Sequence, residues 1–240
     1  MQLAYQYETL KKVALSATWV LAVVLSLPSS AQTAPSAQEV SDYKGLHAAA
    51  HRGDVAQIEQ GVAATADLNA RDRNGRTPVH VATFARQADA IRALVKAGAN
   101  LNALDADRYD AVTIASVADD ETTLKLLLQL GASAKQITSR YDGSALIAAA
   151  HLGHDGVVRQ LIAAGAPLNL VNNLHWTAVI ESIVLGNGGP RHQESLKALI
   201  SAGASLTLTD RQGNTPLQLA KSRGYGEMVK MLEEIGRAHV

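Results

Sequence analysis

The chain has 240 residues, of which 47% are hydrophobic but only 4% aromatic, and it contains no cysteine. This apolar share is enough for a folded core, and because it comes mostly from Ala, Leu, Val and Ile it favours close helix packing over an aromatic-filled sandwich or barrel. The lack of cysteine excludes a disulfide framework, a thiolate zinc site and a cysteine nucleophile. The 22 basic and 22 acidic side chains balance, which argues against a nucleic-acid-binding protein.

The first 31 residues have the pattern of a secretory signal. Lys11 and Lys12 precede an uncharged apolar run at 13–27, and small residues stand at Ser29 and Ala31, the two positions that a signal peptidase reads. The apolar run is shorter than the roughly 20 residues that a membrane crossing needs. We therefore expect a cleavable signal peptide at 1–31, with an uncleaved membrane anchor as the alternative.

Cleavage after Ala31 leaves a chain with 20 basic and 21 acidic residues and no later apolar run long enough to span a membrane. Residues 32–41 (QTAPSAQEVS) are small and polar, and this composition predicts a flexible linker. The expected location is the periplasm of a bacterium, with secretion or anchoring through an uncleaved signal as alternatives.

An internal repeat begins near residue 42. The stretch DRNGRTPVHVA from Asp72 recurs as DADRYDAVTIA from Asp105 and as DRQGNTPLQLA from Asp210, and AGANLNA from Ala97 recurs as AGASLTL from Ala202. The first core residues of successive units are separated by 33, 33, 34, 33 and 38 residues. Such a period predicts stacked units in which each unit buries the apolar face of its neighbour.

The period and the sequences RTPVHVA and AGANLNA resemble the ankyrin repeat. The resemblance covers residues 42–236 and implies an all-α ankyrin-repeat solenoid of about six helix-turn-helix units with β-turn fingers. The predicted units are 42–71, 72–104, 105–138, 139–171, 172–209 and 210–236, followed by a tail at 237–240. Local chemistry agrees, because Thr77 is a good helix cap before Pro78, and Gly98 follows an apolar helical run that it can end.

The middle units, the third to the fifth, depart from the pattern. The fifth has a five-residue insertion at 187–191 between its helices, which is either a tolerated loop extension or a contact element carrying Arg191 and His192. The third has Arg108 in place of the turn glycine and Asp110 in place of the cap threonine. We therefore expect the stack to be least stable around the third unit.

Eight histidines raise the question of a metal site. His47 and His51 are four residues apart, and His151 and His154 three apart, so each pair can share one helix face. The two pairs fall in different units, no HExxH motif is present, and the resemblance gives His47 and His80 a structural role in joining adjacent turns. We expect no metal, no cofactor and no catalytic residue. A metal-assisted hydrolase that uses the four paired histidines is the alternative from another functional class.

The few aromatic residues fall at positions that the ankyrin resemblance assigns to the concave, partner-binding face. Five of the six aromatics after residue 31 map to finger turns or to the ends of first helices, and arginines occupy the same fingers. Aromatic residues and arginine are the usual anchors of protein interfaces. The predicted partner-binding residues are Tyr43, Arg73, Arg76, Phe84, Tyr109, Arg140, Tyr141, His151, Trp176 and Arg211.

Together these features predict an exported, non-enzymatic binding protein. Its expected partner is a protein, it is expected to be a monomer, and no nucleic-acid binding is expected. A stoichiometric inhibitor or immunity factor for an exported enzyme is the alternative within the binding class.

Overall fold

The computed structural model describes residues 33–238, and the predicted signal peptide at 1–31 lies outside this range. A short helix, α2 (Ala37–Asp42), precedes a series of helix pairs. The pairs are α3 (Gly45–Arg52) with α4 (Val55–Ala63), α5 (Pro78–Phe84) with α6 (Ala88–Lys96), α7 (Ala111–Val117) with α8 (Glu121–Gln129), α9 (Ala145–Leu152) with α10 (Asp155–Ala163), α11 (Ala178–Val184) with α12 (Pro190–Ser201), and α13 (Pro216–Ser222) with α14 (Gly226–Ala238).

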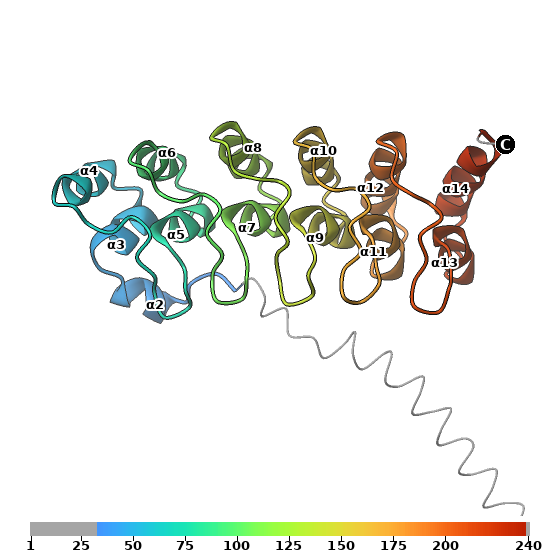
Figure 1. Cartoon of the computed structure of the whole chain (residues 1–240), viewed down its shortest axis with the longest axis horizontal. Helices are drawn as coiled ribbons and strands as arrows, with labels where there is room; N and C mark the ends of the chain where they lie inside the picture. Colours follow the sequence, from blue (N-terminus) through green and yellow to red (C-terminus); the bar gives the residue numbers. More distant parts are fainter. Residues whose placement is uncertain (1–32, 239–240) are drawn as a thin grey trace, which may run out of the picture. The chain divides into compact units, whose positions relative to one another are not determined.

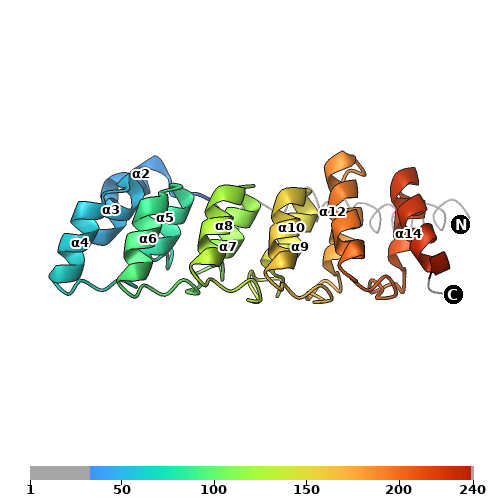
Figure 2. The ribbon, with the colours of Figure 1, turned by 90° about the horizontal axis from the view of Figure 1, so that it is seen from above.

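The pairs stack so that equivalent helices form two rows (Figures 1 and 2). The inner row is α3, α5, α7, α9, α11 and α13, and the outer row is α4, α6, α8, α10, α12 and α14; each helix contacts its counterparts in the adjacent pairs. Turns that extend beyond the inner row, away from the outer row, connect the pairs (Figure 1). We call these turns finger 2 (72–76), finger 3 (105–109), finger 4 (138–143), finger 5 (172–176) and finger 6 (210–214). This arrangement confirms the predicted all-α repeat fold.

The core is aliphatic and runs through both rows. Its largest fully buried side chains, each less than 2% exposed, are all Leu or Ile: Ile58, Ile91, Leu94, Ile114, Leu124, Leu127, Leu146, Leu161, Ile180, Ile183, Leu196 and Leu199. One helix pair cannot cover its own apolar face, so burial of these residues depends on the neighbouring pairs.

Histidines join inner helices to the next finger, as the resemblance implies. The Thr77 N–H donates to Nδ1 of His80 at 3.0 Å, so the Nε2–H of His80 is the donor to the Tyr109 carbonyl, also at 3.0 Å. His47 makes the equivalent contact, with its Nε2 2.9 Å from the Arg76 carbonyl. Burial lowers the pKa of His80, which keeps the ring neutral in this role.

The third pair keeps a helix cap despite its altered sequence. Arg108 takes the turn position that Gly75 and Gly213 occupy in other units. Its φ of 65° lies in the left-handed region, and this backbone conformation costs a residue with a side chain roughly 1–2 kcal/mol. Asp110 replaces threonine as the cap and accepts a 2.7 Å hydrogen bond from the Thr113 N–H. The low stability of this unit stays a prediction, which hydrogen exchange along the stack would test.

The segment predicted to be a flexible linker, 32–41, instead contains most of α2. Ser36 and Glu39 form a capping box: the Glu39 N–H donates to Ser36 Oγ at 3.2 Å, and the Ser36 N–H donates to the Glu39 carboxylate at 2.8 Å. This exchange satisfies two groups at the helix start and explains why a polar segment is helical. The linker prediction is therefore wrong for residues 37–41.

At the other end, α14 continues to Ala238, two residues beyond the predicted end of the repeat domain. Within residues 33–238, no helix combines the length and the hydropathy that crossing a bilayer requires.

Candidate partner-binding surface

The candidate site is the surface formed by fingers 2–6 and the adjoining C-terminal ends of the inner helices, which we call the finger surface. Eight of the ten predicted binding residues keep some exposure there or at its N-terminal edge. Arg73, Arg140 and Arg211 are exposed, and Tyr43, Phe84, Tyr141, His151 and Trp176 are partly exposed.

Arg76 and Tyr109 are buried, with exposed fractions of 8% and 5%, so the prediction that they present their side chains to a partner is wrong in this structure. Adjacent fingers cover this position: the Ser139 N–H of finger 4 donates to the Arg108 carbonyl of finger 3 at 3.0 Å, next to Tyr109. Burial raises the pKa of the Tyr109 phenol to about 12. Residue position alone does not reveal how closely neighbouring fingers approach.

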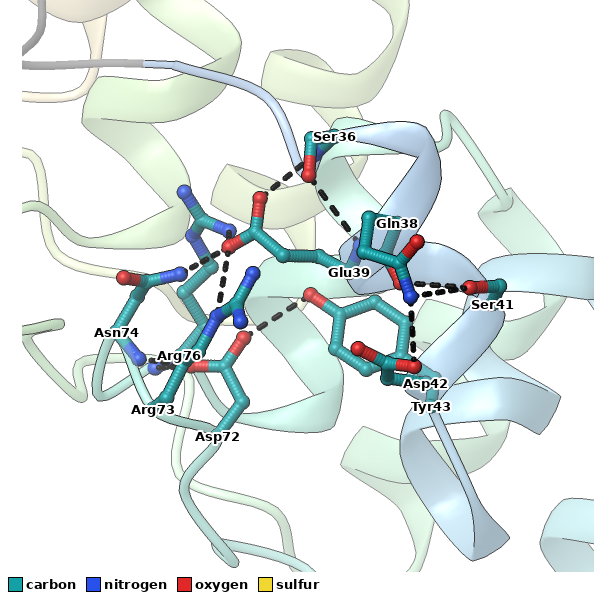
Figure 3. Close-up of polar contacts among 10 residues, drawn as sticks. All are labelled: Ser36, Gln38, Glu39, Ser41, Asp42, Tyr43, Asp72, Arg73, Asn74 and Arg76. Carbon is teal, nitrogen blue, oxygen red and sulfur yellow. Dashed lines mark hydrogen bonds and ion pairs between the residues drawn. The ribbon is translucent and has the colours of Figure 1, made fainter.

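At the N-terminal end, side chains of α2 and finger 2 form a polar cluster (Figure 3). Oε1 of Glu39 lies 3.3 Å from Nη1 of Arg76 and 3.6 Å from Nε of Arg73, and it also accepts a hydrogen bond from the Asn74 amide. Hydrogen bonds from Ser36 together with the charge of Arg76 lower the pKa of Glu39 to about 2. Glu39 is therefore ionised across the physiological range.

Ring contacts extend this cluster toward the inner helices. The Arg76 guanidinium lies 5.4 Å from the centre of the Phe84 ring, a cation–π distance. The Tyr43 hydroxyl donates a 3.0 Å hydrogen bond to the Asp72 carboxylate, and the Tyr43 ring stacks on His47 with ring centres 5.6 Å apart. The N-terminal part of the finger surface is thus occupied by the chain's own α2 segment.

Adjacent fingers are tied together by polar contacts. Nη1 of Arg108 lies 2.8 Å from Oδ1 of Asp142, and Nη2 of Arg140 lies 3.4 Å from Oδ1 of Asp107, so fingers 3 and 4 share two crossed ion pairs. Between fingers 5 and 6, Arg211 donates to the Asn173 carbonyl. Two of the predicted binding arginines therefore also hold the fingers in place.

Exposed apolar residues precede fingers 4 and 5, and sequence reasoning missed them. Ile137 is 46% exposed and Val171 is 40% exposed, at equivalent positions of successive units. The same position holds Arg71 before finger 2, Leu104 before finger 3 and Thr209 before finger 6. The signal was available, because the repeat alignment places three apolar residues, Leu104, Ile137 and Val171, together in a column that is polar at both ends.

A buried carboxylate lies beneath the middle of the finger surface. Glu181 of α11 is 4% exposed; its Oε1 accepts from the Asn172 amide at 2.9 Å, and its Oε2 lies 3.5 Å from Nδ1 of His151. Burial raises the pKa of Glu181 to about 7 and lowers the pKa of His151, so both groups favour their neutral forms. The positions equivalent to Glu181 in the second and third units hold Val81 and Ile114. An ionisable residue at a repeat position that is otherwise apolar was therefore a signal that sequence reasoning missed.

The insertion at 187–191 forms a tie across three units rather than a free loop. Pro190 and Arg191 begin α12, and Nη1 and Nη2 of Arg191 donate to the two carboxylate oxygens of Asp119 at 2.8 and 3.0 Å, while its Nε donates to Asp155 at 3.1 Å. Arg191 lowers the pKa of Asp119. His192 lies 2.9 Å from the His151 carbonyl. The contact element is thus an intramolecular one.

Arg191→Ala is expected to lower stability by about 1 kcal/mol, because it removes a two-pronged guanidinium–carboxylate contact that is half exposed. The unfolding midpoint should fall by about 2–4 °C. Arg92→Ala is the matched control, since Arg92 is similarly exposed and has one 3.9 Å ion pair within its own helix. Equal midpoints for the two variants would contradict a role for Arg191 across units.

The paired histidines make separate contacts and do not converge. His47 is engaged with the Arg76 carbonyl, His51 lies against the Tyr43 ring, and Nδ1 of His154 is 2.9 Å from the Ser116 carbonyl. Within the described residues, no three side chains of His, Cys, Asp or Glu come close enough together to hold a metal ion.

Comparisons of this chain with family models and with known proteins all point to one family. The family model for ankyrin repeats (three copies) matches residues 46–138, 112–210 and 146–238. The Escherichia coli (strain K12) ankyrin repeat protein YahD is 34% identical over 189 residues, which cover 78% of this chain and 94% of YahD.

Solved structures agree with this result. An ankyrin repeat domain from Acinetobacter baumannii AYE is 42% identical with a TM-score of 0.75, over 80% of this chain and 97% of that one. A chain in the complex of the predatory endopeptidase Bd0816 from Bdellovibrio bacteriovorus with the immunity protein Bd3460 is 25% identical with a TM-score of 0.63, over 80% of this chain and 98% of that one. The chain therefore belongs to the ankyrin repeat family.

Proposed function

We propose that this protein is exported and binds one protein partner on the finger surface without catalysing a reaction. The observation that carries the proposal is the composition of fingers 4 and 5. Partly exposed Tyr141 and Trp176 lie on these two fingers, which are joined by a 2.9 Å hydrogen bond from the Asn173 N–H to the Tyr141 carbonyl. Exposed Ile137 and Val171 precede them. Aromatic and apolar groups held on fixed turns are typical of interface anchors.

Export is supported by the signal pattern of residues 1–31, and the periplasm is the proposed location. The near-neutral charge and the absence of a converged histidine site in the described residues support a protein partner over nucleic acid or metal-dependent chemistry. The protein is proposed to act as a monomer, since an extended stack offers one partner a large surface without self-association.

Trp176→Ala is expected to weaken partner binding by 2–4 kcal/mol, or about 30- to 1,000-fold, if Trp176 is the central anchor. Partners would be captured from the periplasmic fraction with the purified protein and their dissociation constants measured with each variant. Lys125→Ala, an exposed change on outer helix α8, is the control and should leave affinity unchanged. Undiminished capture by a Trp176→Ala, Tyr141→Ala double variant would rule out the finger surface.

A second candidate function is a stoichiometric inhibitor or immunity factor for an exported enzyme. It is favoured by the similarity to a chain of the endopeptidase–immunity protein complex. In this case the captured partner is an enzyme whose activity falls to zero at one equivalent of the protein, and its production without the protein harms the cell. A captured enzyme that retains full activity at saturation would exclude inhibition while leaving the binding function intact.

A further inference from the structure

The α2 helix itself is attached to the stack through polar groups, and the residue that follows it, Tyr43, packs against the core. None of its six residues is buried, and its capping box is satisfied within the segment itself. Glu39 makes the ion pairs from α2 to finger 2, and Tyr43, directly after the helix, adds one hydrogen bond to Asp72 (Figure 3). Because no residue of α2 itself is buried, this helix can open at a fraction of the free energy of global unfolding.

The site that receives Glu39 is a carboxylate receptor. Donors from Arg73, Asn74 and Arg76 converge on one oxygen of Glu39, whose side chain is only 13% exposed. Arg76 is held in place from the other side by the Phe84 ring. A guanidinium pair with a neighbouring amide recognises a carboxylate whichever chain carries it.

Space beside the occupied receptor is available for an incoming chain. A depression of about 420 Å³ is lined by residues of α2, finger 2 and the start of α3, among them Glu39, Tyr43, His47 and Arg73. The receptor also lies at one end of the finger surface proposed to bind the partner. Of the three residues whose donors hold Glu39, Arg73 also lines this depression, so an acidic segment entering there would meet Arg73 at the edge of the receptor.

We propose that residues 33–43 form a displaceable latch, in which Glu39 fills a carboxylate receptor on finger 2 until an acidic side chain of the bound protein partner replaces it. The exchange substitutes one carboxylate for another, so the nearly buried Arg76 keeps a negatively charged neighbour in both states. The proposal rests on the proposed function only in assigning the incoming carboxylate to the protein partner. The latch itself is tested without any partner.

The first arm of the test is Glu39→Gln in the purified protein. Glutamine also serves in a capping box, so the substitution removes the charge and preserves the helix start. Backbone amides of 37–43 are expected to exchange with solvent at least about tenfold faster, while amides of α5 and α7 exchange at the wild-type rate. Glu59→Gln, at an exposed carboxylate of α4, is the matched control and should change neither.

The second arm adds a probe, the synthetic peptide of residues 33–43 (TAPSAQEVSDY), to the Glu39→Gln protein. Saturable NMR shifts of the amides of residues 73–76 are expected, with a dissociation constant on the order of millimolar because a short tether supplies a comparable effective concentration. Wild-type protein, with its receptor filled, should bind the peptide at least about fivefold more weakly. The same peptide with glutamine in place of Glu39 should give no saturable shift.

Three results would overturn the proposal. Faster exchange in α3 and α5 together with α2 would make α2 a structural cap, and unchanged exchange in α2 would remove the role of Glu39. Faster exchange of α2 without peptide binding would show that finger 2 does not accept a carboxylate supplied from outside. None of these results bears on capture by Trp176, so the latch and the proposed function fail separately.

Discussion

Replacing Glu181 by glutamine is expected to stabilise the protein by about 3 kcal/mol at pH 8–9 and to have little effect at pH 4–5. Burial raises the pKa of Glu181 in the folded protein to about 7 from 4.5. The folded state therefore binds a proton more tightly than the unfolded state. The stabilising contribution of this proton is complete below about pH 4.5 and is lost as pH rises through about 7, where the carboxylate must ionise in the core.

Glutamine keeps an oxygen for the Asn172 amide and cannot ionise, so it removes this pH dependence. Thermal unfolding of the wild type and the variant across pH 4–9 measures the effect, with an expected gain at high pH of about 6–12 °C in the midpoint. Glu194→Gln, at an exposed carboxylate of α12, is the control and should give parallel curves at all pH values. A constant difference between wild type and Glu181→Gln over the range would contradict an elevated pKa.

Ile58→Ala is expected to destabilise the first helix pair by 2–5 kcal/mol while leaving the C-terminal pairs almost unchanged. Ile58 is fully buried and is the one buried residue of α4, so its loss leaves a cavity with no other buried side chain of that helix to compensate. Each pair in a stack contacts only its neighbours, and a terminal pair can therefore open separately. Amide exchange in α3 and α4 should accelerate at least about thirtyfold.

Leu161→Ala in α10 provides the contrast, because Leu161 is equally buried but has helix pairs on both sides. That change should accelerate exchange in the neighbouring pairs and lower the main unfolding midpoint. If Ile58→Ala instead accelerated exchange equally from α3 to α14, the stack would unfold as one cooperative unit.

The repeat period predicted the fold because the same sequence pattern recurs in successive units along most of the chain. Finger turns, helix caps and aliphatic core positions recur at equivalent places, and each recurrence supports the others. The α2 helix has no counterpart in the repeat. Its capping box, Ser36 to Glu39, was visible in the sequence, but its contacts with Arg73 and Arg76 depend on tertiary structure.

The sequence predicted which surface forms the candidate site. It predicted less well which side chains of that surface are exposed and which residues they contact. Trp176 and Tyr141 keep partial exposure, whereas Tyr109, at the position equivalent to Trp176, is enclosed by the next finger. Arg191 was recognised as part of an insertion, but its partners Asp119 and Asp155 lie 72 and 36 residues away in the chain. Pairing over such separations follows from the stacking geometry, which sequence spacing does not specify.

The ties between fingers have a consequence for the thermodynamics of recognition. Crossed pairs between Arg108 and Asp142 and between Arg140 and Asp107 restrict the turns before any partner arrives. A surface whose turns are already ordered loses little conformational entropy on association, so more of the contact energy remains as affinity. Breaking these ties at Asp107 and Asp142, which are not among the predicted partner-binding residues, should therefore make binding more enthalpic and more entropically unfavourable, with faster dissociation of the complex.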